Sequence, residues 1–245
     1  MRRQRLTLLP QQRPDLERQV IALTEPQMHY LRHVLRLRDG DKFWLLDGVG
    51  SWYETQLQGT LAQVGEPTLA PSQELGIELH LAIAMPKGTA MESVVRHATE
   101  LGVHHIHPLW SDRTVNRHDL GRQKLQRWQR IASEAAELSL RSHCPPVSAP
   151  QDYSQWLANW ADTFGQKLIA VTDRGAPHLL NLWASNCDRP MALLTGCEGG
   201  WTARETQAAQ DYGFRPCSLG DRTLSAVTAP LAGLSLLAAL WESQQ

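Results

Sequence analysis

The sequence predicts an α/β protein in two parts, a small β-rich domain over residues 1–72 and a larger domain over residues 73–245. In the first part, glycines separate short segments with strand-like patterns. From residue 77 onward, apolar strands alternate with amphipathic helices, which predicts a parallel sheet covered on both faces. A chain of 245 residues, 42% hydrophobic and 20% charged, is long enough to bury both cores.

In the N-terminal part, Thr24 and the proline two residues later predict the start of a helix that reaches residue 35. Residues 42–46 and 51–64 are predicted to be strands, with glycines at positions 40, 48, 50, 59 and 65 marking their ends and turns. Residues 66–72 contain two prolines and a serine, and we expect a linker there.

The second part contains five predicted strands and five predicted helices. The strands are residues 77–84, 103–109, 168–172, 191–195 and 214–219. The helices are residues 89–102, 120–140, 177–184, 202–212 and 224–241. Two of these helices begin with a hydroxyl residue followed three positions later by a glutamate, at Thr89 and Thr202, which predicts capping boxes.

Charge and cysteine content exclude several classes of protein. Twenty-four Lys and Arg against 25 Asp and Glu give a net charge of −1, so a basic coat over the whole molecule is absent. Residues 1–40 nevertheless hold eight arginines and four acids. Helical spacing predicts Arg32 and Arg36 on one face beside His29 and His33, which indicates a phosphate-contacting face or simply a solvated one. Four widely spaced cysteines predict a reduced, cytoplasmic chain without a zinc–cysteine site.

The apolar run over residues 224–241 is expected to be a core or interface helix rather than a membrane span. It contains Pro230 and Gly233 and has no flanking basic residues.

Two glycine-rich loops, residues 195–200 and 219–222, follow predicted strands near the C-terminus. Parallel sheets bind ligands beyond the carboxyl ends of their strands, and glycine lets the backbone approach a ligand closely. We therefore expect a ligand site there, with ordinary strand-to-helix turns as the alternative. Neither loop is a P-loop, so nucleoside triphosphate hydrolysis is not predicted.

Three histidines lie close together at His104, His105 and His107. On a strand, only His105 and His107 share a face, and the nearest acid is Asp112. We therefore expect no metal site.

Several short motifs, in this order and at this spacing, resemble the ribosomal RNA small subunit methyltransferase E family of the SPOUT superfamily. The motifs are HYLRHVLR (29–36), MPKG (85–88), ELGV (100–103), RW (127–128), EAAE (134–137), GCEGGWT (196–202) and LGDRTL (219–224).

The resemblance implies a PUA-like β-barrel that binds RNA and a SPOUT α/β domain with a trefoil knot. It implies S-adenosylmethionine as cofactor and methylation of N3 of a uridine in 16S rRNA (uridine 1498 in the family) of the small ribosomal subunit. It also implies a cytoplasmic homodimer packed through the C-terminal helix.

The resemblance further implies a set of site residues without a metal. The cofactor-binding residues are Leu194, Thr195, Gly196, Glu198, Gly199, Gly200, Leu219, Gly220, Arg222, Leu224 and Thr228. The RNA-binding residues are Arg5, His29, Arg32, Arg36 and Lys87, and Arg222 is also the candidate catalytic residue.

The sequence departs from the family pattern after the second loop, where Ser225 and Val227 stand at positions that hold Arg and Glu in the family. Arg222, Glu198 or Lys87 would have to replace that pair. Two alternatives stay open: a divergent member that binds RNA or cofactor without efficient transfer, and a small-molecule α/β enzyme unrelated to RNA.

Overall fold

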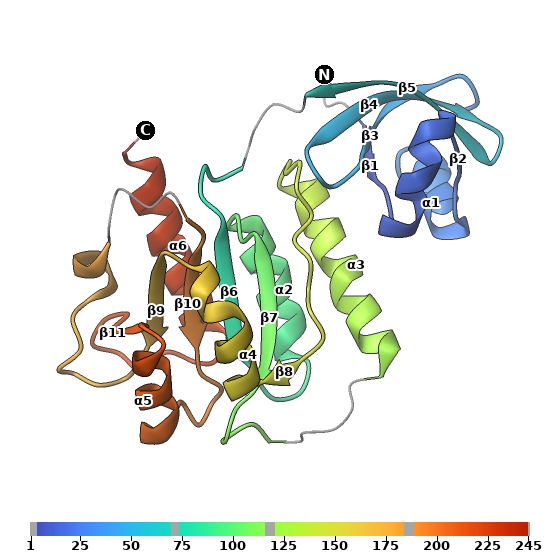
Figure 1. Ribbon diagram of the computed structural model, residues 1–245. Coiled ribbons are helices and arrows are strands. Elements are labelled where there is room, and N and C mark those ends of the chain that lie inside the picture. Colours follow the sequence, from blue (N-terminus) through green and yellow to red (C-terminus); the bar gives the residue numbers. More distant parts are fainter. Residues whose placement is uncertain (1–3, 70–73, 116–120, 184–188, 245) are drawn as a thin grey trace. The chain divides into compact units, whose positions relative to one another are not determined.

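The structure is a computed structural model that describes residues 4–69, 74–115, 121–183 and 189–244 (Figure 1). Its contacts divide the chain into two compact units. The first is Met1–Glu74 with Ala136–Cys144, and the second is Leu75–Ala135 with Pro145–Gln245. The boundary expected at residues 72 and 73 lies outside the described residues and stays a prediction.

The N-terminal unit is built on a curled five-stranded sheet of order β1-β3-β4-β5-β2 (Figure 1). Its strands are β1 (Arg5–Thr7), β2 (Val20–Ala22), β3 (Lys42–Leu46), β4 (Ser51–Gln58) and β5 (Leu61–Leu69). Strands β1 and β3 pair in parallel, and the other neighbours pair antiparallel. The predicted β-rich N-terminal part is therefore confirmed.

The strand predicted over residues 51–64 is in fact a hairpin, because the chain turns at Gly59, which has φ +61°. Strand β5 also continues through Leu69, so the linker prediction is wrong for residues 66–69, while residues 70–72 lie outside the described residues. Strand β2 pairs only with residues 61–63 of β5, so the outer edge of β5 at Pro67 faces no described strand. Proline is tolerated there because no strand on that edge needs a backbone N–H from it.

Short helices close the N-terminal core. Helix α1 (Glu25–His29) begins at Thr24, whose hydroxyl accepts a hydrogen bond from the N–H of Gln27, as predicted. A π-helical turn (Tyr30–Val34) follows, and the chain then leaves the helix. A 3-10 helix (Pro10–Arg18) was not predicted, since its apolar residues show no helical period.

The C-terminal unit contains a six-stranded sheet of order β11-β9-β10-β6-β7-β8 in which every pair is parallel. The strands are β6 (Leu79–Ala84), β7 (His105–Trp110), β8 (Gln151–Asp152), β9 (Gln166–Ala170), β10 (Met191–Thr195) and β11 (Arg215–Cys217). Strands β6 and β10 are buried along their whole length, as central strands covered on both faces must be.

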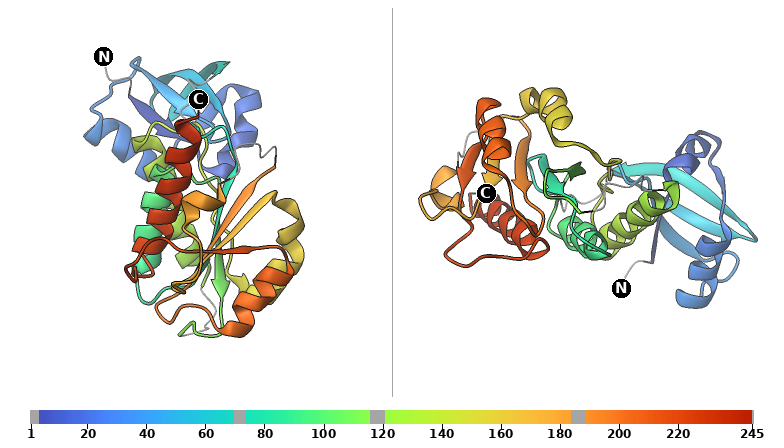
Figure 2. Two further views of the ribbon diagram at one scale, coloured as in Figure 1. Left: turned by 90° about the vertical axis from the view of Figure 1, so that its left-hand side faces the viewer. Right: turned by 90° about the horizontal axis from the view of Figure 1, so that it is seen from below.

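Helices cover both faces of this sheet (Figure 2). They are α2 (Ala90–Glu100), α3 (Arg122–Leu138), α4 (Tyr153–Trp160), α5 (Ala203–Asp211) and α6 (Thr228–Glu242). Helices α4 and α5 share one apolar cluster with the sheet, while α6 packs on β6, β10 and α2. At Gly233 of α6, a Cβ would come within 2.5 Å of Leu193, so only glycine permits this approach.

Four details of these helices differ from the sequence predictions. Thr89 does not cap α2 with its side chain, because its backbone (φ −99°, ψ 5°) is not extended. The helix predicted over residues 177–184 is a 3-10 turn (Leu179–Leu182), with residue 184 outside the described part. Helix α6 begins at Thr228 rather than residue 224, and α4 was not predicted.

The chain after β11 passes between two arms of a single loop. The carbonyl oxygen of Cys217 accepts from Val171 N–H at 2.9 Å. On its other side, Ser218 donates to the carbonyl of Pro177 and accepts from Leu179 N–H, both at 2.9 Å. Val171 on one side and residues 177–179 on the other thus flank this segment.

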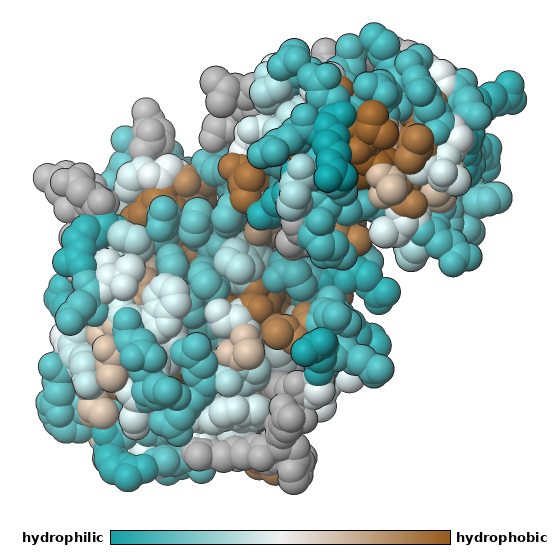
Figure 3. Space-filling view, turned by 45° about the vertical axis from the view of Figure 1, so that its right-hand side comes forward, coloured by the Kyte–Doolittle hydropathy of each residue, from teal (hydrophilic) through white to brown (hydrophobic). Residues whose placement is uncertain are grey.

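Polar side chains cover most of the face shown in Figure 3, with separate apolar patches between them. Among the described residues, no helix combines the length and apolar character needed to cross a bilayer.

Candidate functional site

A cavity of about 720 Å³ lies at the carboxyl ends of β9, β10 and β11. Most of its lining comes from residues within the segments 170–178, 196–203 and 216–226, not all of which reach the cavity, with further side chains from α5. Its volume falls in the range of roughly 300–1,000 Å³ that is usual for small-molecule sites. The ligand site expected from the sequence therefore coincides with a real cavity.

The loop after β10 needs glycine at two positions. A Cβ on Gly196 would lie 3.1 Å from the Cα of Gly200, so the turn has no room for a side chain. Gly200 has φ +67° and donates its N–H to the carbonyl of Cys197 at 2.8 Å. No atom lies within 4 Å of the place that a Cβ on Gly200 would take, so this backbone is open.

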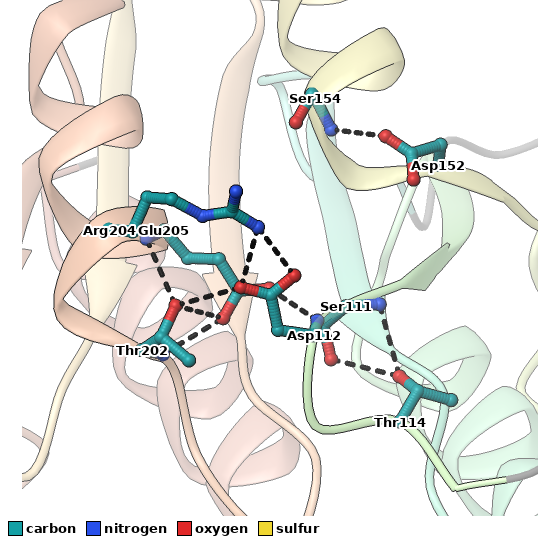
Figure 4. A network of polar contacts seen from close by, with 8 residues as sticks. All are labelled: Ser111, Asp112, Thr114, Asp152, Ser154, Thr202, Arg204 and Glu205. Carbon is teal, nitrogen blue, oxygen red and sulfur yellow. Dashed lines mark hydrogen bonds and ion pairs between the residues drawn. The ribbon is translucent and has the colours of Figure 1, made fainter.

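A polar network holds this loop and the start of α5 in place (Figure 4). Thr202 caps α5, and the Glu205 carboxylate accepts from its N–H at 2.8 Å and its hydroxyl at 3.0 Å. The other carboxylate oxygen accepts from Asp112 N–H at 2.7 Å. Arg204 pairs with the Asp112 carboxylate at 2.9 Å, so the loop after β7 is fastened to α5.

Two further contacts strengthen this attachment. The Tyr153 hydroxyl donates to the carbonyl oxygen of Glu205 at 2.7 Å, and burial, followed by the charge of Glu205, raises the pKa of Tyr153. The Arg113 guanidinium donates to the carbonyl of Gly199 at 2.6 Å. Gly199 therefore packs against Arg113 and does not line the cavity.

The loop after β6 reaches the same edge of the sheet. The N–H of Lys87 donates to the Glu198 carboxylate at 3.0 Å, and both residues are exposed. Lys87 and Glu198, assigned to RNA and cofactor respectively, thus lie together outside the cavity lining.

The loop after β11 contributes a cation and a helix cap. Gly220 has φ +117°, a conformation that favours glycine. The Arg222 side chain is exposed at the cavity and has no ion pair with any residue that the structure describes. Ser225 accepts a hydrogen bond from Thr228 N–H at 3.0 Å and so stabilises the first turn of α6.

The cavity brings together six of the eleven predicted cofactor-binding residues, namely Gly196, Gly200, Leu219, Gly220, Arg222 and Leu224. The lining does not include the other five, Leu194, Thr195, Glu198, Gly199 and Thr228. Leu194 and Thr195 are fully buried in β10, and Thr228 is bonded to Ser225.

Sequence reasoning missed the third side of the cavity. Residues 171–178 follow β9, and Thr206, Gln207 and Gln210 come from α5. The signal was present, because the carboxyl end of the strand predicted at 168–172 lies at the same edge as the two glycine-rich loops.

The predicted RNA-binding residues of the N-terminal unit do not share one helix face. Arg32 bonds to the Asp39 carboxylate and donates to the carbonyl of Gly59 at 3.0 Å, and its side chain is 27% exposed. Arg36 lies beyond the helix with φ +58°, so its expected position on one face with Arg32 is wrong. Hydrogen bonds from Arg32 and Gly59 lower the pKa of Asp39.

The remaining candidates have different surroundings. His29 and His33 are exposed, with ring centroids 4.8 Å apart, and belong to the predicted face. The Arg5 guanidinium lies 5.0 Å from the ring centroid of Trp52, a cation–π contact within the N-terminal unit.

Two protein-family models match the chain. An RNA methyltransferase domain matches residues 73–238, and an RNA methyltransferase PUA domain matches residues 23–60. The first covers the sheet, its helices and all three loops around the cavity.

Curated relatives and a solved structure agree with these matches. The chain is 43% identical over 244 residues to ribosomal RNA small subunit methyltransferase E of Synechocystis sp., covering 98% of this chain and 78% of that protein. It is 28% identical to the protein of the same name from Bacillus subtilis, covering 90% of each. A crystal structure of the Neisseria gonorrhoeae protein of that name, bound to S-adenosyl methionine, is similar with TM-score 0.82 and 28% identity, covering 98% of each chain.

Proposed function

Because the chain belongs to the ribosomal RNA small subunit methyltransferase E family, we propose that it transfers the methyl group of S-adenosylmethionine to N3 of a uridine in 16S rRNA of the small ribosomal subunit. The observation that carries the proposal is the cavity at the carboxyl ends of β9, β10 and β11, bounded by glycine-rich loops. The family match over residues 73–238 removes the support for a small-molecule enzyme unrelated to RNA.

The residues around the cavity fit this cofactor. Backbone at Gly200 is open to a ligand, and among the described residues Gly220 has only the Arg222 guanidinium near its Cβ position, at 4.0 Å, which suits a molecule bound largely through main-chain groups. Leu219 and Leu224 would offer apolar surface to the bound cofactor, and Asp221 would add negative charge that favours a positively charged sulfonium. When bound, the cofactor supplies a methyl group that a nitrogen lone pair can attack.

Arg222 is the residue that we assign to the target base. Uracil N3 carries a proton at neutral pH, so the reaction needs its loss and stabilisation of the resulting anion. Arg222 lines the cavity and is free of ion pairs with described residues, so its charge is available to the uracil oxygens. A cation there lowers the pKa of N3, and the proton leaves to solvent.

The positions of Ser225 and Val227 give this family member a different arrangement. Ser225 uses its hydroxyl to cap α6, and Val227 has no titratable group. We therefore propose that Arg222 replaces the missing pair. The alternative is a protein that binds cofactor and RNA but transfers methyl groups poorly.

We further propose that RNA contacts come from the N-terminal unit, through Arg5, His29 and Arg36, and from Lys87. Apolar side chains of α6 remain half-buried in the single chain, and we propose that a second copy covers them in a homodimer. These are Leu231, Leu236 and Leu240. Small ribosomal subunits are cytoplasmic, and we place the protein there.

The test is methyl transfer by the purified full-length chain. It is incubated with S-adenosylmethionine carrying a labelled methyl group and with small subunits that lack the modification, and the rRNA nucleosides are separated. We expect labelled 3-methyluridine with wild type and with Arg215→Ala, an exposed control outside the cavity, and a loss of more than about 100-fold with Arg222→Ala. Cofactor binding without transfer by wild type would support the alternative, and absence of both would refute the proposal.

A further inference from the structure

Three histidines from neighbouring strands converge on one face of the C-terminal sheet. His80 lies in β6, and His105 and His107 lie in β7. One ring nitrogen of each lies within 4.8 Å of the others. Nδ1 of His80 and Nε2 of His107 share a hydrogen bond of 3.0 Å, and the rings of His105 and His107 stack at 3.9 Å.

Strand register creates this cluster. His80 pairs directly with His105, and His107 follows two residues later, so all three side chains leave the same face. Sequence reasoning counted two convergent histidines because it considered a single strand, and β6 supplies the third. His80 is the second residue of β6, near the amino end, whereas the cofactor cavity lies at the carboxyl ends of the strands.

The surroundings remove these imidazoles from water. His107 is 1% exposed and His80 is 5% exposed, and the aromatic rings of Trp160 and Phe164 pack against His80. Nδ1 of His107 is buried without a hydrogen-bond partner in the described structure. His105 is half-buried, which gives the cluster a side open to solvent.

We propose that His80, His105 and His107 bind a divalent transition-metal ion of the zinc class. Zinc–nitrogen bonds of 2.0–2.1 Å at tetrahedral angles place ligand nitrogens about 3.3 Å apart. The 3.0 Å between His80 Nδ1 and His107 Nε2 is close to this separation. The three ligand nitrogens lie within 4.8 Å of one another, so ligation requires His105 to move closer to the other two.

Imidazole donors select zinc, copper or nickel over magnesium and calcium, which prefer oxygen. Three histidines leave one tetrahedral position for water or for the hydroxyl of Ser148, which lies 2.8 Å from His105 Nε2. The ion would join β6, β7 and the segment around Ser148. Its role is therefore structural and separate from methyl transfer.

The test uses full-length protein without a histidine tag, stripped of metal by a chelator and titrated with Zn²⁺ by calorimetry. We expect one ion per chain for wild type. His105→Ala should weaken binding by more than about tenfold, because loss of even an outer-shell partner costs 10–100-fold. His97→Ala, which removes an exposed imidazole from α2, should leave binding unchanged.

Two further readouts separate ligation from folding. Co²⁺ bound to wild type should give the intense visible absorption of tetrahedral cobalt, and Zn²⁺ should raise the melting temperature of wild type and His97→Ala but not of His105→Ala. The proposal is overturned if wild type shows no saturable binding, or if His105→Ala binds Zn²⁺ with wild-type affinity. A folded His105→Ala, verified by circular dichroism, keeps the second outcome decisive.

Discussion

Replacing Glu205 with glutamine should release the loop after β7 from the start of α5. In the native structure, the two carboxylate oxygens of Glu205 serve two backbone donors, Asp112 N–H at 2.7 Å and Thr202 N–H at 2.8 Å. A glutamine offers one oxygen and one NH₂ group, so in either orientation an amide donor faces a backbone donor. Because Glu205 is 4% exposed, water does not readily replace the lost acceptor.

The size of the effect follows from the kind of bond that is lost. A hydrogen bond to a charged group contributes about 1.5–3 kcal/mol, and about 1.4 kcal/mol corresponds to a tenfold change in an equilibrium. We therefore expect hydrogen exchange at the N–H of Asp112 or Thr202 to accelerate roughly 10- to 150-fold in Glu205→Gln.

Amide exchange measured by NMR checks this prediction residue by residue. Asp211→Asn is the matched control, since it makes the same carboxylate-to-amide change at an exposed position of the same helix. It should leave both exchange rates unchanged. Wild-type exchange at both amides of Glu205→Gln would show that the carboxylate does not hold the loop, and the reasoning would be refuted.

Three other substitutions test separate parts of the structure. Gly200→Ala should weaken binding of S-adenosylmethionine, measured by calorimetry, more than tenfold. It should also destabilise the fold by about 1–2 kcal/mol, because φ is +67° there, and for the same reason Gly200→Val would unfold the loop as well as block it. Unchanged affinity of Gly200→Ala for the cofactor would contradict a ligand at this backbone. Burial raises the pKa of Glu74, but Arg141 and the N–H groups of His143 and Ser142 lower it below its usual value. This lowered pKa stabilises the N-terminal unit above about pH 4.5, and the stabilisation is lost as pH falls through the folded pKa. The free energy of unfolding in urea, measured between pH 3 and 6, should therefore depend more steeply on pH in wild type than in Glu74→Gln. The same pH dependence in both proteins would disprove the role of Glu74. Arg36→Ala should weaken binding to small-subunit rRNA and reduce the slope of log affinity against log salt concentration by about one. An unchanged slope would show that Arg36 makes no phosphate contact. Arg32→Ala is a less clean test, because it also removes the ion-pair partner of Asp39.

Local signals in the sequence predicted those parts of the fold that depend on neighbouring residues. Thr24 and Thr202 both cap helices as expected. Thr89 has the same pattern and fails, because a cap also needs an extended backbone at the cap residue, which the preceding chain decides.

Features that depend on pairing between distant segments could not be predicted in this way. His80 meets His107 only through the register of β6 with β7, and Ser218 meets Pro177 only through backbone pairing with the loop after β9. Likewise, Arg32 forms an ion pair with Asp39, although its helical spacing predicted a contact with RNA.

Nucleoside mass spectrometry of 16S rRNA from cells that lack this gene tests the central claim most directly. We predict that 3-methyluridine is missing at one position, that the wild-type gene restores it, and that the gene for Arg222→Ala does not. An identical content of 3-methyluridine with and without the gene would contradict the assignment of methyl transfer to this protein.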